Sequence, residues 1–169
     1  MMSSEQQLQD LYRNTVLEHS RHPRNFRRLE PADRTVQGHN PLCGDKITVY
    51  LRLDDDDITD VAFEGTGCAI AMTSASIMTE IIEGQSVQAA NEEVDRVMSQ
   101  FRGPAAGGPD STEDFSTMGE MAALGGVRAY PSRIKCATLA WKTLEAALHG
   151  EAVPVTTELN GGENVRARQ

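Results

Sequence analysis

The chain has 169 residues and a mass of 18.4 kDa, a length that favours a single globular domain. Its 25 acidic and 16 basic residues give a formal net charge of −9, which argues against a protein that binds nucleic acid through phosphate contacts. Partners are therefore expected to be proteins or small molecules. The longest apolar stretch is far shorter than the ~20 residues needed to cross a bilayer, and the polar N-terminus lacks a signal-peptide pattern. We expect a cytoplasmic protein without membrane contact.

The first expected element is an amphipathic helix over about residues 4–20, because Ser4 to Gln7 can form a capping box and apolar residues then recur at helical spacing. A basic segment follows over residues 21–28, where Pro23 discourages helix. This segment is interpreted either as a solvated linker or as a docking site for an acidic partner surface.

Two strands are expected next. Apolar and polar residues alternate over residues 47–53, and a second alternating run covers residues 58–63. Four consecutive aspartates at residues 54–57 separate them, which predicts a hairpin turn. These aspartates lack the interleaved glycine and distal glutamate of a calcium loop, so we interpret them as a solvated turn.

The rest of the chain reads mainly as helix. Helical patterns cover residues 68–82, 87–101 and 118–124, and the last runs from residue 131 to Gly150. Residues 102–108 read as a loop, and Gly125 and Gly126 are expected to close the short helix. After Gly150 large apolar side chains are few, so we expect one domain over residues 1–150 and a flexible tail over residues 151–169.

The histidines are not expected to carry the chemistry. His39 is interpreted as a hydrogen-bonded loop residue. His19, His22 and His149 lie at helix ends or in a linker, where exposure to solvent is the default expectation. Trp141 and four methionines are most simply core residues: Met72, Met78, Met118 and Met121.

The three cysteines are the strongest candidates for chemistry. Cys43 lies in a loop two residues before Asp45, Cys68 follows Gly-Thr-Gly at a helix start, and Cys136 lies near the start of the last helix. Three distant thiols are too few for a disulfide framework. Cysteines that only fill a core are expected within an apolar stripe, whereas these lie at element boundaries. This placement favours metal ligands or nucleophiles, with inert small residues as the alternative.

If the three thiols and Asp45 converge, they form a sulfur-rich site with one oxygen ligand. Such a site suits zinc or an iron–sulfur cluster, and it is a poor match for magnesium or calcium. Three thiolates, one carboxylate and Zn²⁺ sum to −2, so nearby cations are expected to moderate the charge. Arg133 and Lys135 shortly precede Cys136 in the sequence and could do so, although both could simply be exposed.

Three separated motifs resemble one known family. Residues 40–45 (Asn-Pro-Leu-Cys-Gly-Asp), the small-residue run over residues 67–76, and residues 133–141 around Cys136 are similar to the NifU N-terminal or IscU-like iron–sulfur assembly proteins. The resemblance covers about residues 4–150. It implies an α/β (α+β) fold of the SufE/NifU-like type, with a small three-stranded antiparallel sheet flanked by helices. It also implies that Cys43, Asp45, Cys68 and Cys136 are the metal ligands.

Two features place the resemblance nearest to the SufU branch. The IscU type has a histidine immediately before its last cysteine, where this chain has Lys135, and it lacks the additional stretch that precedes Val127 here. In the SufU branch the resemblance implies zinc-dependent sulfur transfer from a PLP-dependent cysteine desulfurase, a SufS-like partner. Cys43 matches the acceptor cysteine. An arginine at the position of Arg133 is implied to help a desulfurase histidine approach the zinc and displace Cys43.

Two functions are therefore carried forward. The first is a zinc-dependent sulfurtransferase, an enzyme with a protein co-substrate, in which Cys43, Asp45 and Arg133 perform the transfer and sulfur passes toward downstream iron–sulfur assembly proteins. In this function zinc keeps Cys43 deprotonated and shielded from oxidation until docking frees it. The alternative is a scaffold on which the same four ligands assemble a [2Fe–2S] cluster for transfer to apo-proteins. A structural zinc domain is the least favoured interpretation.

Overall fold

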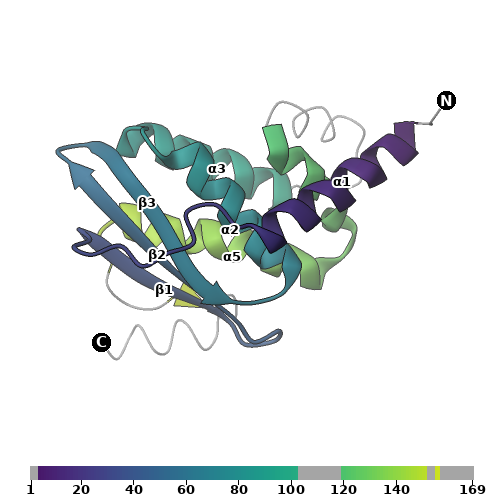
Figure 1. The fold of residues 1–169 in the computed structure, drawn as a ribbon, viewed down its shortest axis with the longest axis horizontal. Coiled ribbons are helices and arrows are strands. Elements are labelled where there is room, and N and C mark those ends of the chain that lie inside the picture. The colour runs from purple at the N-terminus through teal and green to yellow at the C-terminus, as the bar shows by residue number, and fades with distance from the viewer. Residues whose placement is uncertain (1–3, 103–118, 152–154, 157–169) are drawn as a thin grey trace.

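A computed structural model describes residues 4–102, 119–151 and 155–156 (Figure 1). The helices are α1 (Ser4–Arg21), α2 (Ala69–Ile82), α3 (Val87–Arg102) and α5 (Pro131–Leu148), with a 3₁₀ helix, η2 (Gly119–Ala129). The strands are β1 (Arg34–Asn40), β2 (Asp45–Asp54), β3 (Asp57–Thr66) and β4 (Val155–Thr156). Most of the expected loop over residues 102–108 lies outside the described residues, as does Met118.

The strands form one mixed sheet in the order β3-β2-β1-β4. β2 pairs antiparallel with both β1 and β3, as expected for the small antiparallel sheet. The expected fold class is confirmed, with one difference: β4 adds a short parallel strand beside Gly38 and His39 of β1. Two residues are too few to show an alternating pattern in the sequence. The division into a domain over residues 1–150 and a tail stays a prediction, since residues 157–169 lie outside the described part.

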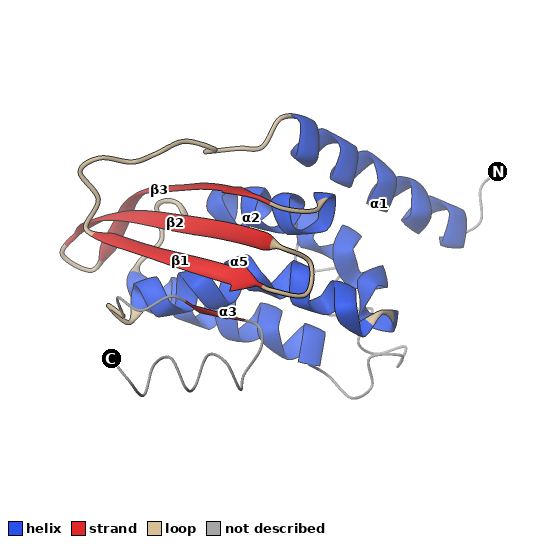
Figure 2. Ribbon diagram, turned by 90° about the horizontal axis from the view of Figure 1, so that it is seen from below, coloured by secondary structure: helices blue, strands red, loops and turns tan. Residues whose placement is uncertain are grey.

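The core lies between the sheet and the helices, which cover one of its faces (Figure 2). The alternation in β2 turns Ile47, Val49 and Leu51 toward this core, where Trp141 of α5 is fully buried. The opposite face of the sheet is covered by the chain that follows α1, where Leu29 packs with Tyr50 and Ala62. This second face is covered only in part, since Thr35 and Gln37 of β1 and Lys46 of β2 are exposed.

Asp55 lies in the expected hairpin turn, and Gly84 lies in the turn that follows α2. Gly84 has a φ of +87° directly after α2, a conformation that favours glycine. Asp55 has a φ of +57° in the hairpin, and all four aspartates of the turn are exposed, as predicted.

The short helix differs from its prediction. η2 does not end at Gly125 and Gly126 but continues to Ala129. Its buried residues Met121, Leu124 and Val127 recur at every third position, which is the period of a 3₁₀ helix. Packing of that face therefore outweighs the tendency of the two glycines to stop the helix.

The expectation that His19 is exposed to solvent is wrong. It is fully buried, and its Nδ1 lies 2.7 Å from Ser76 Oγ of α2, whereas His22 and His149 are exposed as expected. His19 lies in the last turn of α1 on the side that packs against α2, where polar side chains face it. Because burial of an imidazole requires a hydrogen-bond partner, the hydroxyl of Ser76 makes this position tolerable.

The basic segment over residues 21–28 forms ion pairs within the chain. Arg24 contacts Glu18 at 3.1 Å, Arg27 contacts Asp60 at 2.7 Å, and Arg28 contacts Glu30 at 2.7 Å. Phe26 also forms a parallel bridge with Phe63 at the edge of β3. Three of these cations therefore already have acidic partners.

No helix in the described ranges has the length and apolar character needed to cross a bilayer.

Candidate metal centre

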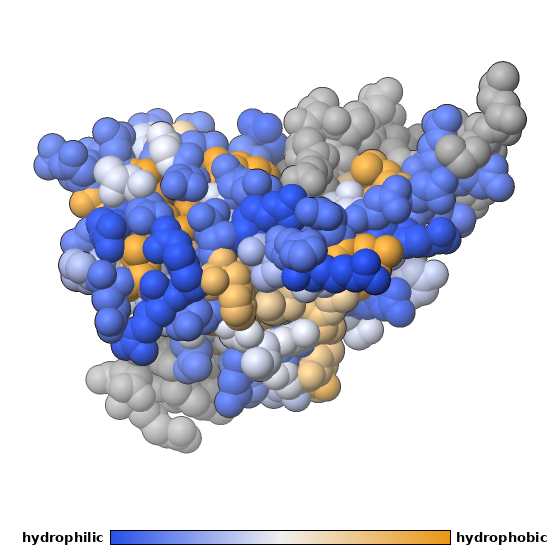
Figure 3. Space-filling model, in the orientation of Figure 1, coloured by the Kyte–Doolittle hydropathy of each residue, from blue (hydrophilic) through white to orange (hydrophobic). Residues whose placement is uncertain are grey.

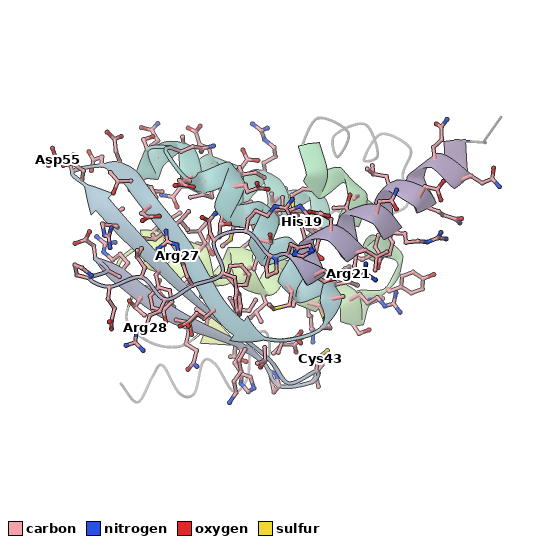
Figure 4. All side chains as sticks on the ribbon, in the orientation of Figure 1. His19, Arg21, Arg27, Arg28, Cys43 and Asp55 are labelled. Atoms are coloured by element: carbon pink, nitrogen blue, oxygen red, sulfur yellow. The ribbon has the colours of Figure 1, made fainter. Side chains whose placement is uncertain are left out.

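Cys43 is presented by the tight loop that joins β1 to β2. The backbone carbonyl of Asn40 accepts hydrogen bonds from the N–H groups of Cys43 (3.3 Å) and Gly44 (2.8 Å). The Asn40 side chain accepts a third from Leu42 N–H at 3.2 Å, as in an Asx turn. Gly44 has a φ of +77°, which favours glycine at the point where the chain enters β2. The loop leaves Cys43 exposed at one end of the sheet (Figure 4).

Asp45 is the first residue of β2, and its side chain is directed toward the start of α2. The residue is only 1% exposed. Its Oδ1 accepts the N–H of Cys68 at 2.9 Å, and its Oδ2 lies 3.7 Å from Cys68 Sγ. A Cβ on Gly67 would lie 2.9 Å from Asp45 Oδ1, closer than such contacts allow. Gly67 therefore permits the carboxylate to reach the helix start.

Cys68 occupies the N-cap of α2, as the sequence predicts. Its extended backbone (φ −70°, ψ 166°) precedes the helix, and its sulfur accepts the N–H of Ala71 at 3.4 Å. Helix N-termini carry unpaired N–H groups and a partial positive charge, both of which favour a thiolate. Cys68 is exposed, so its sulfur is at the surface as well as at the helix start.

Cys136 lies deeper than the other two cysteines. It is in the second turn of α5, 4% exposed, and belongs to the apolar core. Its Sγ lies 3.5 Å from Cys43 Sγ, too far for a disulfide and close enough for two ligands of one ion. Burial, followed by the adjacent Cys68 and Cys43 thiols, raises the pKa of Cys136 well above the usual cysteine range. A thiolate at this position needs a cation beside it.

The ligand atoms of Cys43, Asp45 and Cys136 all lie within 4.8 Å of one another. With Zn–S near 2.3 Å and Zn–O near 2.0 Å, a zinc tetrahedron has edges of about 3.8 Å between sulfurs and about 3.5 Å between sulfur and oxygen. The observed separations are 3.5 Å for Cys43 to Cys136 and 3.7 Å for Asp45 to Cys68. Cys68 is beside Asp45 but is not a member of the cluster whose ligand atoms all lie within 4.8 Å of one another. The structure therefore brings three of the four expected ligands together as a sulfur-rich set that could hold a metal ion, with Cys68 next to it.

Arg133 and Lys135, the two cations expected near the site, differ in their exposure to solvent. Arg133 is exposed, and its guanidinium lies 5.3 Å from the centre of the Tyr130 ring, whereas Lys135 is half-buried. Both are in the first two turns of α5, close in sequence to Cys136. His39 is half-buried in β1. Among the described residues it is not a member of the cluster formed by Cys43, Asp45 and Cys136.

Asn40 makes contacts at the site that the sequence analysis did not predict. It is fully buried, and besides closing the Cys43 loop its Nδ2 lies 3.9 Å from Cys136 Sγ. Its amide therefore connects the exposed loop to the buried sulfur. The Asn-Pro dipeptide signals a turn, but a sequence pattern does not show that the same amide reaches α5, 96 residues away.

Comparisons with known proteins agree with this site. The family described as "NifU-like N terminal domain" matches this chain over residues 11–137. The zinc-dependent sulfurtransferase SufU of Bacillus subtilis is 39% identical over 150 residues, covering 89% of this chain and 97% of that protein. The iron–sulfur cluster assembly scaffold protein IscU of Streptococcus pyogenes is 37% identical, covering 86% of this chain and 87% of that protein.

A solved structure supports the same conclusion. The crystal structure described as an iron–sulfur cluster assembly scaffold protein for the SUF system from Fervidobacterium islandicum is 33% identical, with a TM-score of 0.71. The alignment covers 82% of this chain and 97% of that one. Sequence, fold and a convergent cysteine–aspartate cluster thus agree, and the chain belongs to the family of NifU-like N-terminal domains, with SufU-like and IscU-like iron–sulfur cluster assembly proteins among its relatives.

Proposed function

We propose that this protein is a zinc-dependent sulfurtransferase that accepts persulfide sulfur from a PLP-dependent cysteine desulfurase. The observation that carries the proposal is the exposed Cys43 thiol on a short loop, 3.5 Å from the buried sulfur of Cys136. An acceptor must be reachable by another protein, and of these two sulfurs Cys43 is the exposed one. The SufU relative named as a zinc-dependent sulfurtransferase supports this assignment.

Cys43, Asp45, Cys68 and Cys136 are the proposed zinc ligands. A zinc ion bound there supplies positive charge that keeps the thiols deprotonated and protects them from oxidation. The chain's own residues determine which ligand can leave. Cys136 is held within α5 and Cys68 within the N-cap of α2, while Cys43 lies on a loop between two strands. Loop residues move at lower cost than residues packed in helices.

The proposed transfer is a thiol–persulfide exchange. The Cys43 thiolate attacks the terminal sulfur of the donor's cysteine persulfide, forming a new S–S bond. The old S–S bond breaks, the donor cysteine leaves as a thiolate, and Cys43 holds the persulfide with its proton. Atoms and charge balance without an added oxidant or reductant. The persulfide then passes to later proteins of iron–sulfur cluster assembly.

Asp45 and Arg133 also have proposed roles in this transfer. Asp45 is the one hard oxygen ligand among sulfurs, so its substitution is expected to change the rate of metal exchange. Arg133 is exposed near Cys136 and is proposed to contact the docked desulfurase. A reducing compartment such as the cytoplasm suits free thiols in this arrangement.

A scaffold function is the second candidate. The same sulfur-rich donor set suits a [2Fe–2S] cluster, and an IscU relative is named as a cluster assembly scaffold. This alternative uses the same four residues to hold a cluster and release it to an apo-protein. The two functions differ in resident metal and in whether Cys43 acquires sulfur.

The deciding experiment combines metal analysis with mass spectrometry of untagged protein. The sulfurtransferase predicts about one zinc per chain, with added sulfur on Cys43 after turnover with a cysteine desulfurase and cysteine. Cys43→Ser is the matched variant and should abolish the added mass. Iron with acid-labile sulfide in place of zinc would favour the scaffold. Label confined to Cys136 would refute Cys43 as the acceptor.

A further inference from the structure

The loop that carries Cys43 has few side-chain groups of its own to hold it in place. Residues 41–44 read Pro-Leu-Cys-Gly, so the thiol is their one polar side chain and none of them is charged. All four are exposed. In Figure 3 the surface in the region where Figure 4 labels Cys43 is white to pale orange, while most of the face shown is blue. The conformation of this loop therefore depends on hydrogen bonds to residues beneath it and not on ion pairs of its own side chains.

The backbone N–H groups of the loop are accepted by one residue, Asn40, the last residue of β1. Pro41 has no N–H group. The side-chain Oδ1 of Asn40 accepts Leu42 N–H at 3.2 Å, and its backbone carbonyl accepts the N–H groups of Cys43 and Gly44 at 3.3 and 2.8 Å. Asn40 is fully buried and pairs with the first residue of β2, so it lies at the base of the loop. One residue thus fixes the path of the chain around the proposed acceptor.

The same side chain also reaches the buried sulfur of the site. Leu42 N–H can only donate, so the amide atom that faces it must be the oxygen, and this places the amide nitrogen on the other side. There Nδ2 of Asn40 donates toward Cys136 Sγ at 3.9 Å. Cys136 belongs to α5 and is 96 residues away in the sequence. A single amide therefore joins the loop to α5, with its oxygen on the loop and its nitrogen on the sulfur.

Sulfur transfer makes two demands on the position of Cys43. Its sulfur must lie beside Cys136 when both hold a metal ion, and the two sulfurs are 3.5 Å apart in this structure. The Cys43 sulfur must also be presented to a donor protein in one orientation, because misplacing a reacting group by about 1 Å can slow a reaction about a hundredfold. A loop without polar side chains beyond the thiol meets both demands only if something beneath it sets its position.

We propose that Asn40 is a positioning residue for sulfur transfer. Its amide is a tether between the Cys43 loop and Cys136 of α5, which keeps the acceptor sulfur exposed and at the same time beside the site. This proposal rests on the proposed sulfurtransferase function and adds a residue that is not a metal ligand and that burial keeps out of reach of the donor. Loss of the tether should therefore slow transfer without weakening the binding of the donor protein.

The first measurement reports the relative position of the two sulfurs and requires neither metal nor desulfurase. Cys68→Ser leaves two thiols, which diamide in the presence of EDTA oxidises to a disulfide by taking up two electrons and two protons. In this background Asn40→Ala should slow formation of the intramolecular Cys43–Cys136 disulfide about tenfold, because it removes both contacts of the amide. Asn40→Ser keeps a hydroxyl that can accept Leu42 N–H but is too short to reach the sulfur, so it should slow the reaction about threefold. Mass spectrometry of alkylated samples taken over time gives the rates.

Asn25→Ala in the same background is the matched control. Asn25 is another asparagine with a side-chain hydrogen bond, from its Nδ2 to Thr79 Oγ1 at 2.9 Å, but it lies between α1 and β1. Its φ is +57°, where alanine is strained, so the substitution should lower the melting temperature. The rate of disulfide formation should stay at that of the background protein. This control separates a general loss of stability from loss of the tether.

The second measurement is desulfurase turnover against the concentration of this chain, with Cys68 intact. Asn40→Ala should lower turnover at saturation about tenfold, and Asn40→Ser should lower it less. The concentration needed for half-maximal stimulation should stay within about twofold of wild type, because a fully buried side chain makes no contact with the partner.

Several results would overturn the proposal. Equal slowing of disulfide formation in Asn25→Ala would assign the effect to stability. Asn40→Ser at the rate of the background protein would show that the contact with Cys136 contributes nothing, and Asn40→Ser at the rate of Asn40→Ala would show the same of the contact with Leu42. A raised half-maximal concentration at unchanged saturating turnover would assign Asn40 to docking. If Asn40→Ala does not fold, Asn40→Ser against the background protein decides the matter.

Failure of the tether and failure of the proposed function give different results. If wild type acquires no persulfide on Cys43, the sulfurtransferase function fails, while disulfide formation still tests the contacts of Asn40. If wild type acquires persulfide and the Asn40 variants match their parent proteins in both measurements, the positioning role fails and the function stands.

Discussion

Asp45 makes two contacts that mutation can separate. One carboxylate oxygen accepts the N–H of Cys68 at 2.9 Å and so links β2 to the start of α2. The other lies 3.7 Å from Cys68 Sγ and is the proposed zinc ligand. Asp45→Ala removes both contacts. Asp45→Asn keeps a neutral oxygen that can still accept the N–H but is a much weaker ligand.

The magnitude follows from the first contact. A hydrogen bond to a charged acceptor contributes about 1.5–3 kcal/mol, and the partial exposure at Cys68 favours a value near 2 kcal/mol. For a chain of this size each kcal/mol corresponds to about 2–4 °C, so Asp45→Ala should lower the melting temperature of the metal-free protein by about 4–8 °C. Asp45→Asn should cost less than about 1 kcal/mol, because it retains the acceptor and removes a charge.

The assay is thermal unfolding followed by circular dichroism, once with EDTA and once with zinc. With EDTA the two variants should differ by several degrees. With zinc both should lose part of the metal-dependent stabilisation, and competition with a chromophoric chelator should show weaker binding in both. Asp45→Ala should retain some metal on the three thiols while changing desulfurase stimulation. Equal melting temperatures for the two variants in EDTA would refute the hydrogen-bond role, and unchanged zinc affinity would remove Asp45 from the ligands.

Three further predictions test other parts of the argument. EDTA should lower the melting temperature of wild type, because metal bound only to the folded chain at a thousand times its Kd stabilises it by about 4 kcal/mol; an unchanged curve would contradict the site. Arg133→Ala should slow sulfur transfer at unchanged zinc content. Arg133→Lys restores the rate if the residue acts by charge alone and fails to if a planar guanidinium contact is needed, and unchanged transfer in both variants would remove Arg133 from the mechanism. Burial and the Glu64 hydrogen bond raise the pKa of Tyr50 above its ordinary value of 10.0, so the folded chain retains this proton at a pH where the unfolded chain loses it. The free energy of unfolding that depends on this proton is therefore fully present below pH 10 and is lost as the pH rises above it. Measured by urea unfolding between neutral and alkaline pH, the free energy of unfolding should fall less steeply with pH in Tyr50→Phe than in wild type. An equal fall in both proteins would contradict this.

The sequence by itself determined the elements whose signals are local. Alternation over residues 47–53 predicted β2, and helical spacing with a cap predicted α1 and α2. The position of Cys68 as an N-cap could be read directly from Gly-Thr-Gly followed by small residues. The three cysteine motifs also pointed to the family, and the family match over residues 11–137 includes all three cysteines.

Contacts between distant residues were decided only by the tertiary structure. His19 was expected to be exposed because nothing near it in sequence shows that Ser76 lies 2.7 Å away, across the packing of α1 on α2. The extension of η2 past Gly125 likewise depends on the core that its buried face meets. β4 is too short for a pattern of its own and exists because β1 offers a free edge.

The site shows the same division. Residue types and motifs pointed to Cys43, Asp45, Cys68 and Cys136, but no sequence pattern states that Cys43 is exposed while Cys136 is buried one helical turn inside α5. That contrast results from the docking of α5 against the sheet, which brings two sulfurs 93 residues apart to 3.5 Å. Candidate ligands can be predicted from side-chain chemistry and motifs, because both are properties of the residues themselves. The exposure of Cys43 and Cys68 and the burial of Cys136 depend on packing, which only the tertiary structure shows.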